Sequence, residues 1–204
     1  MTRFLVTLGA VLGGLLILFM LLSGPYNGLV QGKNRANREF AVVHTQLQRR
    51  ADLIPNLVAT VRGYAEHEER VFTEVTEARA RASQLLQLDP NQIASDPALQ
   101  RQLLDAQQTL SGALSRLMVV VEAYPQLQSS ERFGQLQAQL EGTENRIAVA
   151  RRDAQIAIET YNNRAETFPG NIYAGLFGFE TLAFYEATAP NADQAPTVDF
   201  STTP

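Results

Sequence analysis

Cysteine is absent from this sequence of 204 residues. Without it the chain has no disulfide, no thiolate nucleophile and no cysteine-ligated zinc. Histidine is nearly absent too, since His44 and His67 are the only two. Carboxylate di-metal bundles take a Glu-x-x-His from each of two helices, and neither histidine here lies three residues after a glutamate. We therefore expect no metal ion and no cofactor.

Clustered positive charge and familiar catalytic motifs are also missing. The formal net charge is −4 and the basic residues are scattered, whereas nucleic-acid binding needs a basic surface that follows the phosphates. No stretch predicts a β-strand, so no glycine-rich phosphate loop can follow one. Ser111, Ser115, Ser129 and Ser130 have no histidine close in sequence to activate them. We expect a protein that is not an enzyme and does not bind nucleic acid.

A long apolar run stands near the N-terminus. Residues 4–22 are interrupted only by Thr7 and three glycines, and as a helix they would cover about 30 Å, the thickness of a bilayer core. A cleaved signal peptide is the alternative, but its apolar core is usually only ~7–15 residues long. We therefore expect a transmembrane anchor over residues 1–24. Gly9 and Gly13 form a Gly-x-x-x-Gly, a weak motif in any apolar run, so a self-association face is only an alternative here. Basic residues flank the run on both sides, so charge does not decide the orientation.

Apolar residues then recur at alternating spacings of four and three, the heptad pattern of a helix that buries one face against other helices. The first series contains Ala36, Phe40, Val43, Leu47, Ile54, Leu57, Val61, Tyr64, Val71, Val75, Ala78, Ala82 and Leu85. It predicts one long helix that continues from the anchor to about Gln87. Pro55 removes a backbone donor and predicts a kink. Two positions of this spacing are occupied by charged residues instead of apolar ones, namely Arg50 and Glu68.

Two further heptad series follow. Asp96 and Pro97 have the chemistry of a helix N-cap and first turn, and the apolar spacing predicts a second helix over 98–124 and a third over 131–168. Short loops between long helices favour antiparallel packing. The expected fold is all-α: an N-terminal transmembrane helix, then a long antiparallel three- to four-helix bundle with an aromatic-rich C-terminal tail over 25–187. Residues 188–204 are expected to be irregular.

The tail contains four candidate docking residues, Tyr173, Phe177, Phe179 and Phe184. With three long helices, the tail would start at the end of the bundle far from the anchor. We therefore expect its aromatic side chains to cover exposed core at that end rather than to enter the membrane. Docking of a partner is the alternative, because aromatic residues are enriched at interface hot spots.

Six polar residues are candidates for an interaction site or for fixing helix register: Arg50, Glu68, Glu141, Glu144, Asn145 and Arg151. Spacings of four and seven on the third helix turn the last four of them towards a neighbouring helix. Arg50 and Glu68 would lie about 27 Å apart on one continuous helix, too far for one site. We expect each to pair with an opposite charge across the seam. Recognition of a partner and an acid/base pair in the groove are the alternatives.

Several stretches together resemble the LemA family of bacterial membrane-anchored helical proteins. They are Gln48–Leu57, Gly63–Ala65, Glu122–Pro125, Thr143–Ala148 and Tyr161-Asn162. The resemblance implies one N-terminal membrane segment and a helical bundle, and it implies no agreed biochemical activity. Two positions depart from the family pattern. Ala154-Gln155 replaces an earlier Tyr-Asn pair, and Pro25 replaces a cysteine that some relatives can lipidate.

These features predict a single-pass protein of the bacterial inner membrane whose bundle acts without catalysis as a scaffold or adaptor. The expected partners are the lipid bilayer, membrane or envelope proteins, and other copies of the chain. One alternative is an accessory subunit of an envelope-stress or membrane-maintenance complex. Another is an enzyme that uses the groove of Glu141, Glu144, Asn145 and Arg151.

Overall fold

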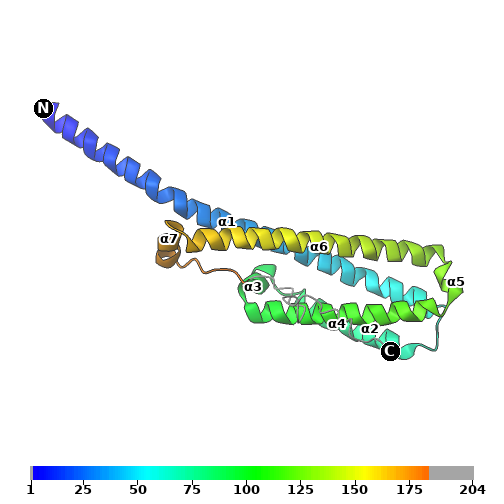
Figure 1. The fold of residues 1–204 in the computed structure, drawn as a ribbon. Helices are drawn as coiled ribbons and strands as arrows, with labels where there is room; N and C mark the ends of the chain where they lie inside the picture. The colour runs from blue at the N-terminus through cyan, green and yellow to red at the C-terminus, as the bar shows by residue number, and fades with distance from the viewer. Residues whose placement is uncertain (1, 184–204) are drawn as a thin grey trace, which may run out of the picture.

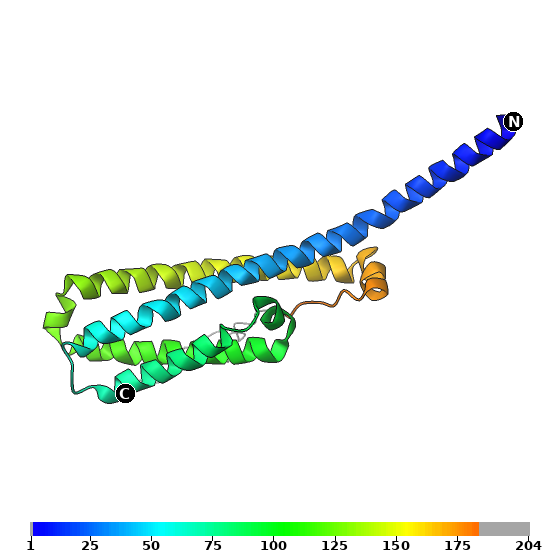
Figure 2. The same ribbon diagram turned by 180° about the vertical axis from the view of Figure 1, so that it is seen from behind.

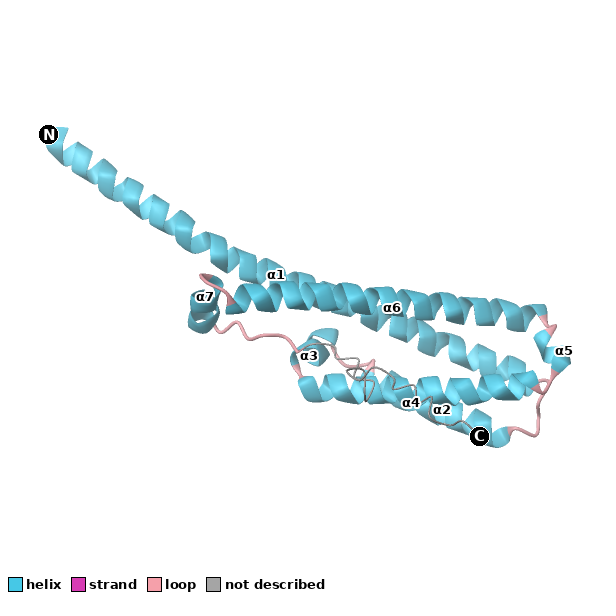
Figure 3. Cartoon of the chain, viewed as in Figure 1, coloured by secondary structure: helices cyan, strands magenta, loops and turns pink. Residues whose placement is uncertain are grey.

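The computed structural model describes residues 2–183, apart from the side chains at positions 2, 3, 5, 6, 11 and 15–22. The described chain forms helices joined by loops, with no strand in that range (Figure 3). Its helices are α1 Thr2–Arg62, α2 Glu69–Leu85, α3 Pro90–Ser95, α4 Pro97–Glu122, α5 Pro125–Gln128, α6 Glu131–Glu166 and α7 Gly170–Phe177. The all-α prediction is confirmed. Phe184 and the stretch 188–204 lie outside the described residues.

Four of the helices form an antiparallel bundle. Figure 1 shows α1 running from the N-terminus along the bundle, α2 returning, α4 running out again and α6 returning. α1 packs mainly against α6, and α2 packs mainly against α4. Seen from behind, the N-terminal part of α1 projects well beyond the other helices (Figure 2). We call the end where α1 enters the bundle the base, and the end with α5 the distal end.

The prediction of one helix reaching Gln87 is wrong, because α1 ends at Arg62 and the chain reverses before α2 begins at Glu69. Gly63 opens the connection, and glycine is a weak helix former. The heptad spacing continues across the turn because α1 and α2 each bury one apolar face, and both faces pack into the same cluster. Tyr64, expected in the seam, is 46% exposed, and its neighbour Ala65 is buried instead. Periodicity alone could not reveal this turn.

Pro55 does not end α1, and the structure shows how the helix tolerates it. Proline has no N–H, so the carbonyl four residues earlier, that of Ala51, loses its helical partner. The Arg79 side chain of α2 donates a hydrogen bond from Nε to this carbonyl at 2.8 Å. Ala51 is fully buried, where an unsatisfied carbonyl would be costly. Arg79 therefore replaces the missing donor from a neighbouring helix.

The core consists of three clusters that follow one another along the bundle. The distal cluster contains Phe72 and joins α1, α2, α4 and the start of α6. The middle cluster contains Ile147 and is covered by α3, whose N-cap Asp89 accepts a hydrogen bond from the Asn91 amide. The cluster at the base contains Tyr161 and joins α1, α6 and α7.

The predicted transmembrane segment at residues 4–22 forms the start of α1, but many of its side chains lie outside those that the structure describes. Within the described set, no helix combines the length and the apolar character needed to cross a membrane.

The C-terminal tail lies at the base, so its expected position at the distant end of the bundle is wrong. The turn after Arg62 adds one reversal of direction, which brings the end of α6 back to the entry point of α1 (Figure 1). Tyr26 of α1 contacts Phe177 and Phe179, with ring centroids 5.0 and 5.6 Å apart. α7 therefore packs beside the part of α1 that directly follows the apolar segment.

Candidate functional site

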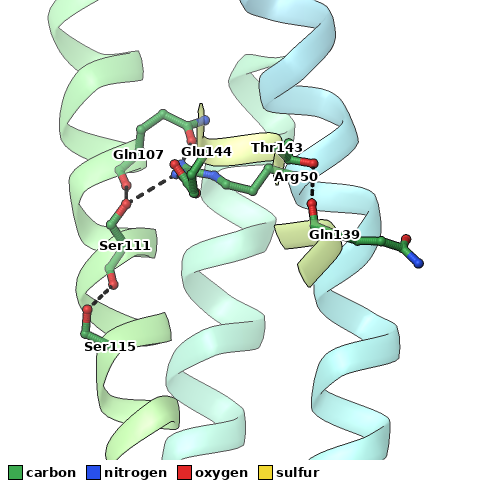
Figure 4. A network of polar contacts seen from close by, with 7 residues as sticks. All are labelled: Arg50, Gln107, Ser111, Ser115, Gln139, Thr143 and Glu144. Atoms are coloured by element: carbon green, nitrogen blue, oxygen red, sulfur yellow. Dashed lines mark hydrogen bonds and ion pairs between the residues drawn. The ribbon is translucent and has the colours of Figure 1, made fainter. Parts of the chain in front are cut away.

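Arg50 is the centre of a polar cluster that joins three helices. Its side chain points from α1 into the core, and the residue is only 2% exposed. The guanidinium donates to Glu144 Oε1 of α6 at 2.7 Å, to Ser111 Oγ of α4 at 3.3 Å and to the side-chain oxygen of Gln107 (Figure 4). The planar fork of arginine has several donors in fixed directions, which suits such a junction. The contacts set the register of α1 against α4 and α6.

Glu144 is the acidic partner of Arg50, and its side chain is 44% exposed while that of Arg50 is 3% exposed. The carboxylate thus connects a buried cation to the protein surface. Thr143, next to it on α6, is buried and donates to the Gln139 carbonyl at 2.7 Å (Figure 4). Because Glu144 is partly exposed, water and salt screen its attraction to Arg50 more than they would in a fully buried pair. The pair therefore serves mainly to hold α1 and α6 in register.

The other candidate polar residues lie elsewhere. Glu141 and Asn145 are exposed on α6 and line, with Glu144, a surface groove of about 420 Å³ against α4. Arg151 is half-buried two turns further along α6. Glu68 occupies the N-cap position of α2, beyond the turn that ends α1, and its side chain makes no capping hydrogen bond. Of the six, the structure pairs Arg50 with Glu144 and places Glu141 and Asn145 beside that pair.

Gln107 and Ser111 are parts of the cluster that sequence reasoning missed. Gln107 is buried, and it lies four residues after Leu103 and three before Leu110, which are both core residues of α4. That spacing places it on the buried face. A glutamine at such a position is a usable signal for a buried polar contact.

Groups that could bind a metal ion are not assembled in the part of the chain that the structure describes. No cluster of three histidine, aspartate or glutamate side chains there has the required proximity. His44, on α1, is half-buried, and burial lowers its pKa although a hydrogen bond to the Leu86 backbone acts in the opposite direction. This contact lies at the C-terminal end of α2, where free carbonyls accept such donors.

Removing Arg50 and removing its acidic partner are both expected to lower the free energy of unfolding. Arg50→Met leaves the buried side-chain oxygen of Gln107 without its donor, so we expect a loss of about 1–3 kcal/mol. Glu144→Ala leaves the buried guanidinium without its carboxylate, and we expect a loss of about 1–2 kcal/mol, reduced by the exposure of Glu144. Urea unfolding followed by circular dichroism measures both.

The double variant is the control for this pair. Once Arg50 is methionine, removing the carboxylate of Glu144 should cost almost nothing. An unchanged free energy of unfolding in both Arg50→Met and Glu144→Ala would contradict the register role of the cluster.

A second polar arrangement fastens the tail to the base. The Tyr161 hydroxyl donates to the Glu180 carbonyl at 2.8 Å. The buried Asn162 side chain donates to the Leu182 carbonyl at 2.8 Å and accepts from the Leu182 amide at 2.9 Å. One amide side chain thereby satisfies both backbone groups of a residue, as a neighbouring strand would. The Tyr-Asn pair noted in the sequence holds residues 180–182 against α6.

The tail aromatics lie around this anchor point. Tyr173 and Phe177 of α7 stack with ring centroids 6.3 Å apart, and Phe179 is half-buried against the base cluster. The fourth candidate, Phe184, lies outside the described residues. Gly170, at the start of α7, approaches α6 so closely that an added Cβ would meet the Arg164 carbonyl oxygen at 1.9 Å. α7 is therefore tightly packed on the bundle.

An apolar groove lies between α1 and α6 on the side of the bundle. It has a volume of about 370 Å³ and is lined by Glu39, Val42, Gln46, Asn145, Arg146, Val149, Ala150 and Asp153. Val42 and Val149 are exposed, as is Ile156, which lies one heptad beyond Val149 on α6. Both signs of charge stand at the rim. Apolar residues with a charged rim are the usual composition of a helix-binding groove.

Comparison with known proteins finds similarity to curated magnetosome proteins. Magnetosome proteins MamQ 1 and MamQ 2 of Paramagnetospirillum magneticum are each 29% identical to it over 175 residues, which is 79% of this chain and 64% of each relative. Magnetosome protein MamQ of Magnetospirillum gryphiswaldense is 25% identical over 174 residues, 78% of this chain and 64% of that protein. The chain therefore spans less than two thirds of the length of these curated relatives.

The family model described as LemA family matches residues 39–200, which is most of the chain. The matched region begins in α1 and includes every later helix. It also includes the Arg50 cluster and the Tyr161-Asn162 pair. The resemblance drawn from the sequence is confirmed, and the chain belongs to the LemA family.

Proposed function

We propose that this protein is a non-catalytic scaffold or adaptor of a bacterial membrane, attached through the start of α1 and binding a helix of a partner protein in the groove between α1 and α6. The observation that carries the proposal is the exposed apolar floor of that groove, formed by Val42 and Val149. Ile156 extends the apolar line along α6. An amphipathic helix laid there would complete a packing like that of the bundle itself.

The rim favours a protein partner over a small ligand. Glu39, Arg146 and Asp153 line an open groove in which opposite charges can fix the direction and register of a bound helix. Small-molecule sites are usually concave and bury most of their ligand. Membrane attachment is supported by the apolar sequence at residues 4–22 and by the family of the chain. The relatives are named as magnetosome proteins, which suggests a role at an organised membrane.

The groove can be tested with a photo-crosslinking amino acid at Val149 of the full chain in intact cells. We expect a crosslink to one specific protein, identified by mass spectrometry, that disappears when Val42→Glu is added. This second change places a charge on the groove floor while the exposed position leaves the fold intact. The matched control is the same crosslinker at Val119, an exposed apolar residue of α4 that does not line the groove.

Three results would contradict this proposal. Equal capture at Val119 would show that the contact is unspecific, and retention of the product with Val42→Glu would show that the groove is not used. Crosslinks formed only between copies of the chain would show that the protein assembles with itself and does not act as an adaptor. Membrane attachment is tested separately by whether the full chain floats with membranes, and extraction with alkaline carbonate then distinguishes a spanning from a peripheral attachment.

The alternative functions, an enzyme or an accessory subunit, would use the other groove, which lies beside Glu144. An enzyme or an accessory subunit acting through Glu141, Glu144 and Asn145 would lose function in Glu144→Gln while its helical content and Tm stayed unchanged. A scaffold would lose function only to the extent that the bundle loses stability. The half-exposed carboxylate of Glu144 is the feature that makes this comparison worthwhile.

A further inference from the structure

The segment Thr167–Phe179, which contains α7, exposes an unusual amount of apolar surface. Its thirteen residues include no charged side chain. Phe168, Ile172 and Leu176 are 80%, 58% and 76% exposed. Ile172 and Leu176 lie one turn apart on the same side of α7, and Phe168 lies in the turn just before this helix. We call these three residues the base stripe. Such a row of large apolar side chains marks an interaction surface.

The position of the base stripe indicates what covers it. The segment lies against the part of α1 that follows the apolar run, since Tyr26 contacts Phe177 and Gly28 accepts a hydrogen bond from Arg164 at 2.8 Å. A cavity at the same place is lined by Gly24, Pro25 and residues 167–170. Tyr26 follows Leu22, the last residue of the run, by about 6 Å along the helix. α7 therefore lies beside α1 at the level where the apolar run ends (Figure 2).

The segment is also held firmly. Gly170 and Ala174 are buried against the bundle, and any side chain at Gly170 would collide with the backbone of α6. The hydrogen bonds of Tyr161 and Asn162 fix residues 180 and 182 on the other side of the segment. The apolar stripe is thus presented in a fixed direction by a rigid support rather than by a loose tail.

We propose that the base stripe inserts into the surface of the lipid bilayer and forms a second membrane contact beside the start of α1. The proposal rests on the proposed membrane attachment of α1. Lipid is the occupant that fits because the segment 167–179 has no charged residue of its own and lies beside the part of α1 that directly follows the apolar run. Tyr26 and Tyr173 flank it, and tyrosine favours the headgroup level of a membrane. Two contacts would fix the tilt of the bundle relative to the bilayer.

The absence of native cysteine allows a direct test with single labels. Leu176→Cys and, separately, Ile172→Cys are made in the full chain and labelled with a fluorophore that responds to polarity. Each protein is reconstituted into vesicles of phosphatidylcholine and phosphatidylglycerol, with or without lipids that carry a nitroxide quencher near the top of the acyl chain. We expect a blue shift of the emission on reconstitution and loss of most of the fluorescence with the quencher lipids.

The matched control is Val119→Cys, which labels an exposed apolar position of α4 and should stay in water and unquenched. Flotation of the same samples separates the two proposals. A chain that floats while its labels at 172 and 176 behave like that at 119 overturns the base stripe contact and leaves membrane attachment standing. A chain that does not float overturns both. Efficient disulfide formation between unlabelled Leu176→Cys chains without quenching would assign the stripe to a second copy instead.

Discussion

Replacing Tyr161 with alanine is expected to lower the free energy of unfolding by about 3–5 kcal/mol, the usual cost of removing a buried aromatic side chain. Tyr161 is fully buried in the base cluster. It packs so closely on Gly32 of α1 that a Cβ there would lie 3.3 Å from its ring. Its hydroxyl donates to the Glu180 carbonyl. The substitution therefore opens a cavity between α1 and α6 and also releases the tail.

Urea unfolding of the full chain, followed by circular dichroism, measures this loss. Tyr161→Phe is the matched control, because it keeps the ring and removes only the hydroxyl hydrogen bond, worth about 1 kcal/mol. If Tyr161→Ala cost no more than Tyr161→Phe, the ring would not support the base. Limited proteolysis after residue 168 should increase in both variants, since both lose the hydrogen bond that fixes residue 180.

Comparing the wild type with Tyr161→Phe also gives an expected dependence of stability on pH. Burial, and secondly the charge of Glu180, raise the pKa of Tyr161 above its ordinary value of 10.0. The folded state thus favours the neutral phenol, and its contribution to stability is complete below pH 10 and is lost as the pH rises through the raised pKa. The wild type should lose stability in this alkaline range more steeply than Tyr161→Phe.

Replacing Arg79 with methionine is the second large effect, with an expected loss of about 1–3 kcal/mol in the free energy of unfolding. The change removes the side-chain donor to the Ala51 carbonyl, which is buried and lacks the usual partner four residues on because residue 55 is proline. Methionine keeps much of the length and apolar character of the arginine stem. The loss therefore reports the missing hydrogen bond rather than a cavity.

Pro55→Ala provides the decisive comparison. It restores a backbone N–H to α1, so the Ala51 carbonyl regains its ordinary partner and Arg79→Met should cost little in that background. The coupling energy in the double-mutant cycle should be about 1 kcal/mol or more. Arg81→Met, two residues along α2 and exposed, is the control and should change stability by less than about 0.5 kcal/mol. A coupling energy near zero would contradict the role assigned to Arg79.

Heptad spacing and capping chemistry were enough to predict most of the helices. Asp96 accepts hydrogen bonds from the Ala98 and Leu99 amides at 2.8 and 3.3 Å and precedes Pro97 at the start of α4, as its residue type and position indicated. These signals are local, since they depend on residues within one turn of each other. Local patterns therefore gave the fold class and several boundaries correctly.

The turn after Arg62 was missed, because two antiparallel helices that bury the same face can keep one heptad phase across their connection. That single reversal moved the tail from one end of the bundle to the other. It also placed Arg50 and Glu68 on opposite sides of a turn, Arg50 within α1 and Glu68 at the start of α2. The partners of Arg50 on α4 and α6 depend on packing between distant segments, which spacing within one helix does not specify.

The unbroken course of α1 makes it a lever. It runs as one helix from Thr2 to Arg62, and the part from the base to the distal turn is about 57 Å long. A tilt of about 10° imposed at the base would move the distal turn by about 10 Å. With the start of α1 attached to a membrane, as proposed, a change in the angle or thickness of that membrane would displace the opposite end of the bundle, where α5 and the turn into α2 lie.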